Sequence, residues 1–213
     1  MAEKLDRFAG RQDLVVLGLA RGGVPVAYEV ARSLDLPLDV FVVRKLGAPG
    51  HEEFAIGAIA SGGVRVLNQE AIGLLGITQS MIGRITMLEQ QELNRREKLY
   101  RGGRGAVNVR GRIVILVDDG LATGATMQAA ITSLYKQDPG AIIVAAPVVA
   151  LDTCTYLSRV ADGCEYVVAP EPFYGVGLWY EDFTPTTDRE VQLLLEAAGR
   201  DAPSPVPRYA HRY

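Results

Sequence analysis

Two adjacent carboxylates, Asp118 and Asp119, are the side chains in this sequence best suited to chemistry. They follow five consecutive apolar residues, 113–117, and precede a loop, 120–126, that is built from glycine, alanine and threonine with one leucine. Carboxylates accept hydrogen bonds from sugar hydroxyls and support divalent cations. The loop offers threonine hydroxyls and the free N–H groups of a starting helix, which bind phosphate. The pattern predicts a ligand that carries both hydroxyls and phosphate.

The elements around this stretch predict an α/β protein. The apolar run 113–117 suits a strand that is covered on both faces, and similar runs alternate with helical patterns along the chain. This alternation predicts a parallel sheet of about five strands flanked by helices, whose ligands bind at the carboxyl ends of the strands. The other predicted strands are 14–17, 38–43, 141–146 and 165–168, and the predicted helices are 3–10, 24–34, 79–101, 125–135, 151–160 and 187–198.

Local sequence pattern also predicts the structure of the three regions between residues 44 and 112. Residues 44–63 begin with two cations and a stretch rich in glycine and proline, and recover an apolar pattern at 54–59. They predict a mobile loop that leads into a short antiparallel hairpin with 64–67 as its second arm. In helix 79–101, Met81, Ile85 and Leu88 predict a short buried stripe, with the second half of the helix facing solvent and Glu92 paired with Arg96. Residues 101–112 are interpreted as a solvated connection, with a nucleic-acid contact as the alternative.

Composition limits the function classes. A net charge of −3 and a pI near 5.5 give no general attraction to nucleic acid or to anionic membranes. We expect no signal peptide, because residues 1–13 are charged and lack an apolar core, and no apolar run approaches the ~20 residues that span a bilayer. Cys154 and Cys164 are interpreted as free thiols. We therefore expect a soluble cytoplasmic protein with one domain, 1–200, and a loosely attached tail, 201–213.

The segment VDDGLATGAT, residues 117–126, resembles the phosphoribosyl diphosphate (PRPP) motif of type I phosphoribosyltransferases. The resemblance implies that Asp118 and Asp119 hold the ribose hydroxyls and support Mg²⁺ through water. It also implies that the following loop binds the 5-phosphate through Ala122, Thr123, Gly124, Ala125 and Thr126. A Walker NTPase is excluded because the loop lacks its lysine.

Two further segments are similar to the same family. Ala20, Arg21, Gly22 and Gly23 resemble its pyrophosphate loop, which implies a cis peptide bond between Ala20 and Arg21. Arg44 and Lys45 resemble the cations of its flexible loop, which closes over pyrophosphate and excludes water. The resemblance therefore implies a catalytic set of Arg21, Arg44, Lys45, Asp118 and Asp119.

The segment PFYGVGLWYEDF, residues 172–183, resembles the hood with which some members of the family hold the base, and we expect the hood mainly at 170–185. Phe173, Tyr174 and Trp179 are the candidates for stacking on a flat heterocycle. Ala122 stands where the hypoxanthine-guanine enzymes carry an acid, which argues against a 6-oxopurine. The identity of the base stays open.

The resemblance implies a transferase that moves the 5-phosphoribosyl group from Mg-PRPP to a nitrogenous base. Its partners would be PRPP and the base, and a homodimer is one expectation because dimers are common in that family. The alternative is a PRPP-sensing regulator without transferase activity, which would bind RNA through the basic stretch 95–112. A phosphate-binding hydrolase is the third class.

Overall fold

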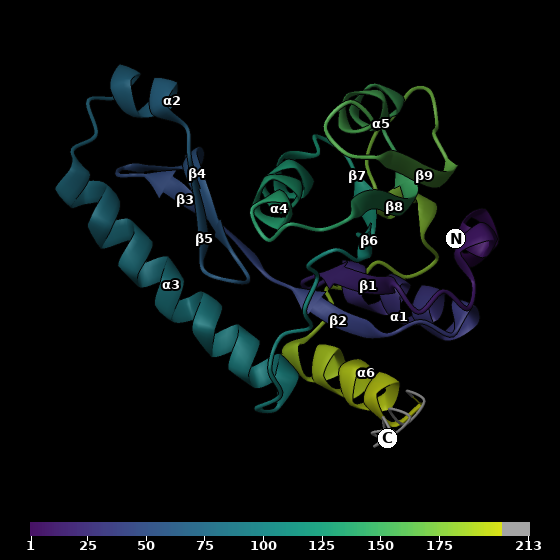
Figure 1. Ribbon diagram of the computed structural model, residues 1–213. Coiled ribbons are helices and arrows are strands. Elements are labelled where there is room, and N and C mark those ends of the chain that lie inside the picture. Colours follow the sequence, from purple (N-terminus) through teal and green to yellow (C-terminus); the bar gives the residue numbers. More distant parts are fainter. Residues whose placement is uncertain (202–213) are drawn as a thin grey trace.

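A parallel sheet forms the centre of the protein in the computed structural model, which describes residues 1–201 (Figure 1). The strand order is β2-β1-β6-β8-β7, and β9 also pairs with β8. Five of these strands were expected, and the two-residue β7 is the addition. The α/β architecture with a parallel sheet is therefore confirmed. The bounds are β1 Leu14–Leu19, β2 Leu38–Phe41, β6 Ile113–Val117, β7 Gly120–Leu121, β8 Ala141–Val149 and β9 Gly163–Val168.

Helices cover both faces of this sheet. Along β1, Leu14 and Val16 pack toward one layer, whereas Val15 and Leu17 pack toward the other, as the period of two along a strand requires. The first layer contains η1 (Ala2–Phe8) and α1 (Gly23–Leu34), and the second contains α4 (Ala125–Tyr135) and α5 (Leu151–Leu157). Double coverage explains why the strands are apolar throughout.

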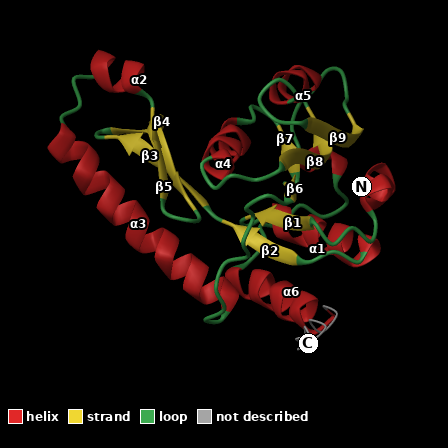
Figure 2. Ribbon diagram, viewed as in Figure 1, coloured by secondary structure: helices red, strands yellow, loops and turns green. Residues whose placement is uncertain are grey.

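A second, antiparallel sheet stands beside the first (Figure 2). It consists of β3 (Val43–Ala48), β4 (His51–Ala60) and β5 (Val64–Leu67), and it is followed by α2 (Gln69–Leu74) and α3 (Gln79–Arg101). The predicted hairpin with 64–67 as its second arm is confirmed by the antiparallel pairing of β4 with β5. The predicted mobile loop before it is wrong, because only Pro49 and Gly50 connect β3 with β4. The single glycine of β3, Gly47, lies between two shifts in the register with β4, and Leu46 and Ile56 are buried.

Helix α3 has the predicted bounds but buries a different face. Met81 and Leu88 are 42% and 57% exposed, whereas Ile82, Leu93 and Tyr100 are buried. The second half of α3 does not face solvent on all sides, because Leu93, Tyr100 and Arg101 are buried and its end packs against α6 (Asp188–Asp201) (Figure 1). The predicted Glu92–Arg96 pair is present at 2.7 Å. No helix in residues 1–201 is both long and apolar enough to cross a membrane.

Arg101, the last residue of α3, is buried in an ion pair with Asp39 of β2. Its Nε lies 3.0 Å from Asp39 Oδ1, and its Nη2 donates to the carbonyl oxygen of Val40 at 2.8 Å. The Asp39 carboxylate also accepts from the backbone N–H of Val107. The interpretation of 101–112 as a solvated connection is therefore wrong at its start, because this network ties α3, β2 and the connection together.

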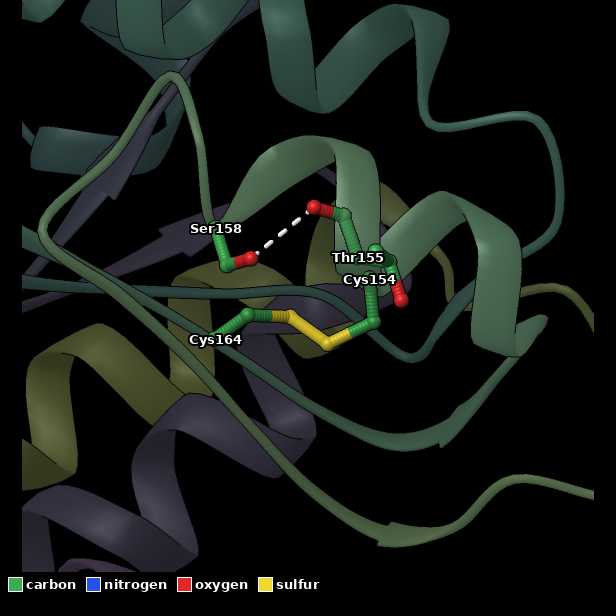
Figure 3. The surroundings of a disulfide bond; sticks show 4 residues. All are labelled: Cys154, Thr155, Ser158 and Cys164. Atoms are coloured by element: carbon green, nitrogen blue, oxygen red, sulfur yellow. Dashed lines mark hydrogen bonds between the residues drawn. A yellow bond between two sulfur atoms is a disulfide. The ribbon is translucent and has the colours of Figure 1, made fainter.

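Cys154 of α5 and Cys164 of β9 form a disulfide, so the prediction of free thiols is wrong (Figure 3). The connection from α5 to β9 folds back on itself and brings the two Cα atoms to 6.0 Å. The sequence separation of ten residues does not reveal this approach, because it depends on how α5 packs on the sheet. The predicted tail beyond Asp201 lies outside the described residues.

Candidate functional site

The acid pair and the loop after β1 meet at one edge of the sheet. Strands β1 and β6 are parallel neighbours, and Gly18 is in register with Val117, so both strands end side by side. A Cβ atom added to Gly22 would lie 1.9 Å from Asp119 Oδ2, and one added to Gly23 would lie 2.4 Å from the carbonyl oxygen of Val117. A side chain at position 22 would displace the Asp119 carboxylate, and one at position 23 would collide with the backbone of Val117 and Asp118. The cis peptide bond predicted between Ala20 and Arg21 is confirmed.

The two carboxylates differ in their surroundings. Burial and the neighbouring Asp119 raise the pKa of Asp118 to about 8. Burial also raises the pKa of Asp119, whose backbone N–H donates to Asp118 Oδ1 at 3.0 Å. Two adjacent buried carboxylates carry full charge most favourably when a cation or several hydroxyl donors face them. The pair is therefore suited to a ligand that brings such groups.

The loop 122–126 presents free donors next to the acids. Gly124 has φ of +70° and precedes α4 without any side chain that caps the helix, so the first N–H groups of α4 remain available to an anion. Ala122, Thr123 and Ala125 are exposed, and Thr126 is half-buried. Thr153 of α5 supports the loop from behind by donating from Oγ1 to the carbonyl oxygen of Ala122 at 2.5 Å. The loop is therefore exposed to solvent, and its position is fixed by the hydrogen bond from Thr153.

Arg21 follows the cis bond and lies beside Asp188 at the start of α6. The two side chains approach to 3.6 Å, and Tyr100 of α3 donates its hydroxyl to the same carboxylate oxygen at 2.7 Å. The hydrogen bond from Tyr100 holds the pKa of Asp188 below its usual range, and nearby arginines add to this effect. The sequence placed Asp188 only within the predicted helix 187–198, but its carboxylate connects the loop after β1 with α3 and α6.

Arg44 and Lys45 lie on strand β3 and not in a loop. The guanidinium of Arg44 contacts Glu89 of α3, with Nε and Nη2 at 2.7 Å and 2.6 Å from the same carboxylate oxygen. Lys45 is exposed on the same strand. The structure therefore ties Arg44 to α3, and the strand assignment corrects the predicted loop.

The predicted hood is an irregular segment with one short turn, η2 (Gly177–Trp179). Phe173 is half-buried, whereas Tyr174 is 80% exposed and Trp179 is 52% exposed, so these aromatic rings are not core residues. The residue that sequence reasoning missed is Tyr180, which donates its hydroxyl to the carbonyl oxygen of Asp119 at 2.6 Å. Tyr180 could have been proposed from the sequence, because it directly follows Trp179 in the same aromatic segment.

Comparisons with known proteins identify the family of the chain. Residues 1–162 match the family model described as phosphoribosyl transferase domain. A Mycobacterium tuberculosis H37Rv protein named "Putative phosphoribosyl transferase Rv0571c" is 41% identical over 201 residues, 94% of this chain and 45% of that protein. The chain thus spans about half the length of the curated relatives it matches.

A solved structure, that of TT1426 from Thermus thermophilus, is 42% identical to this chain. The match covers 91% of each chain with a TM-score of 0.79, so the likeness extends over nearly the whole fold. Together with the family match over most of the sequence, this shows that the chain belongs to the phosphoribosyl transferase domain family.

Proposed function

We propose that the protein transfers the 5-phosphoribosyl group from Mg-PRPP to a nitrogenous base and releases pyrophosphate. The observation that carries the proposal is the contact between the acid pair and the loop after β1. Gly22 packs directly against the carboxylate of Asp119, so a ribose held by the acids would have its pyrophosphate over this loop. The donors of loop 122–126 follow the acids directly in the chain and would bind the 5-phosphate.

Each group has a role set by its charge. Asp118 and Asp119 would accept hydrogen bonds from the ribose hydroxyls, and the N–H groups from Ala122 to Thr126 would bind the 5-phosphate. Ala20, Arg21, Gly22 and Gly23 would face the pyrophosphate, where the Arg21 cation stabilises the charge that develops on the leaving group. Arg44 and Lys45 would assist, and Arg44 would then exchange Glu89 for the pyrophosphate.

The donor set fits a magnesium ion that arrives with the substrate. Within the described residues, no three His, Cys, Asp or Glu side chains are grouped closely enough to hold a metal by themselves. Mg²⁺ is usually bound through one or two carboxylates, water and substrate phosphates. Asp118 and Asp119 would hold it through water, and the ion would neutralise charge on the pyrophosphate.

The acceptor would bind at the segment 172–183. Phe173, Tyr174 and Trp179 are partly or largely exposed there, which leaves their rings free to stack on a flat heterocycle. We propose these three residues as the base-binding group and residues 170–185 as the hood of a single domain, 1–200. We also propose a cytoplasmic location, as expected for this family.

A panel of bases tests the function. Protein, Mg²⁺ and PRPP are incubated with individual purine and pyrimidine bases, and the release of pyrophosphate is measured. We expect release that requires one base or one class of base. Release that is independent of any base would instead indicate a hydrolase, and PRPP binding without release would indicate a regulator.

The RNA-binding alternative gains no support from the basic stretch 95–112. Arg95 and Arg96 bind Glu92, Arg101 binds Asp39, and Arg104 donates to the carbonyl oxygen of Leu195. These guanidinium groups satisfy acceptors within the protein. A surface that binds nucleic acid presents such groups to phosphate instead.

Replacing Gly22 by alanine should lower activity by pushing the Asp119 carboxylate away. The added methyl would lie 1.9 Å from Asp119 Oδ2, so this side chain must move. A shift of about 1 Å in a positioning group can reduce the rate about 100-fold. The measurement is kcat/KM for PRPP with the identified base. The control is Gly105→Ala, where the new Cβ has no neighbour within 4 Å and wild-type activity is expected. Equal rates for both variants would contradict the close contact.

A further inference from the structure

The segment 172–183 is attached directly to the acid pair at two points. Tyr180 donates its hydroxyl to the carbonyl oxygen of Asp119 at 2.6 Å. Gly120 lies so close to Val176 that an added Cβ would be 2.4 Å from Val176 Cγ1. Both contacts fall on the backbone of Asp119 and Gly120, which directly follows Asp118. The contact therefore joins segments that are far apart in the sequence, since Tyr180 and Asp119 are separated by 61 positions.

Both backbone polar groups of Asp119 form hydrogen bonds with side chains, and Tyr180 provides the second of these bonds. The N–H of Asp119 donates to Asp118 Oδ1, and its carbonyl oxygen accepts from Tyr180. The ring of Tyr180 packs on Phe183, with centroids 5.2 Å apart. Burial, together with the negative charge of the acid pair, raises the pKa of Tyr180 to about 12, so the hydroxyl remains a donor at neutral pH. A change in the segment therefore reaches the backbone that orients Asp119.

We propose that Tyr180 is a positioning residue that couples the acceptor segment to the ribose-binding acids through the carbonyl group of Asp119. Acceptor binding at 172–183 and PRPP binding at Asp118 and Asp119 then strengthen each other, because each ligand orders the backbone that the other requires. Such coupling is reciprocal for binding free energies. The inference rests on the proposed function.

Tyr180→Phe tests the coupling because it removes one oxygen atom and keeps the ring. Loss of a hydrogen bond of about 0.5–1.5 kcal/mol should raise the Kd for Mg-PRPP about 2- to 10-fold, measured by calorimetry. Trp179, the single tryptophan of the chain, directly precedes Tyr180 and reports on the segment. In the wild type we expect Mg-PRPP to change the emission of Trp179 and its quenching by acrylamide. In Tyr180→Phe this response should be lost while PRPP still binds.

The matched control is Tyr135→Phe. Tyr135 donates its hydroxyl to Asp162 at 2.9 Å, at the far end of α4, so the same atom is removed elsewhere. This variant should keep both the Kd and the Trp179 response of the wild type. A Tyr180→Phe protein that binds PRPP with an unchanged Kd and an unchanged Trp179 response would overturn the coupling.

A readout without ligand separates failure of the coupling from failure of the proposed function. In the ligand-free protein, acrylamide should quench Trp179 more strongly in Tyr180→Phe than in the wild type, because the segment loses an attachment. Equal quenching would overturn the role of Tyr180 as an anchor. If the wild type binds no PRPP at all, the proposed function fails, and the coupling to PRPP fails with it even when the quenching differs.

Discussion

Replacing both acids, Asp118→Asn with Asp119→Asn, is expected to weaken the binding of Mg-PRPP strongly. Each carboxylate would accept charge-assisted hydrogen bonds from a ribose hydroxyl or from water on the metal, and an amide accepts these bonds more weakly. If each acid contributes about 1.5–3 kcal/mol, their combined loss corresponds to roughly a hundredfold to ten-thousandfold weaker binding. Isothermal calorimetry with Mg-PRPP gives the Kd directly. A double variant that binds as tightly as the wild type would refute the assigned contacts.

The stability of Asp118→Asn provides the control for folding. The folded-state pKa of Asp118 is raised from 3.8 to about 8, so between these values the folded protein holds a proton that the unfolded chain has lost. The contribution of this group to stability therefore falls as the pH rises from about 4 to about 8. Asparagine removes this dependence. In metal-free buffer at pH 8, thermal unfolding should find both Asp118→Asn and the double variant at least as stable as the wild type, because burial raises the pKa of Asp119 as well. Lost binding would then reflect lost contacts and not lost structure.

Arg101→Met is expected to reduce the free energy of unfolding by about 3–5 kcal/mol, because it leaves the Asp39 carboxylate buried without its cation. Asp39 would retain only the N–H groups of Val40 and Val107. Urea denaturation followed by circular dichroism measures the change.

The control for Arg101→Met is Arg110→Met. Arg110 pairs with Asp138 at 3.1 Å, but the two side chains are 74% and 69% exposed, so the loss should be at most about 1 kcal/mol. If both substitutions change the stability equally, burial does not govern the Arg101–Asp39 pair. If Arg101→Met unfolds the protein completely, the predicted loss of stability is confirmed in direction. Arg101→Lys is then the milder substitution with which the size of the loss is measured.

Local pattern predicted the parts of the site that depend on neighbouring residues in the chain. The apolar run 113–117, the acids after it and the glycine-containing turn specify a strand, an acidic end and a helix start, whatever lies around them. Parallel strands bring their carboxyl ends to one edge, so the approach of residues 20–23 to Asp118 and Asp119 followed from the order of elements. The bounds of α3 also followed from its composition.

Contacts between distant segments were decided only by the tertiary structure. The buried face of α3, the pairing of β3 with β4 and the Cys154–Cys164 disulfide each depend on which element packs against which. A charged residue such as Arg101 looks solvent-facing in a sequence, because its partner Asp39 lies 62 positions away.

The same limit applies within the site. The motif 117–126 by itself predicted where a phosphorylated sugar would bind, since its donors and acceptors are adjacent in the chain. The attachment of Tyr180 to the carbonyl oxygen of Asp119 required the fold, because a backbone acceptor has no signature in the sequence. Local hydrogen-bonding groups are therefore readable from residue order, whereas the partners of buried and distant groups are set by packing.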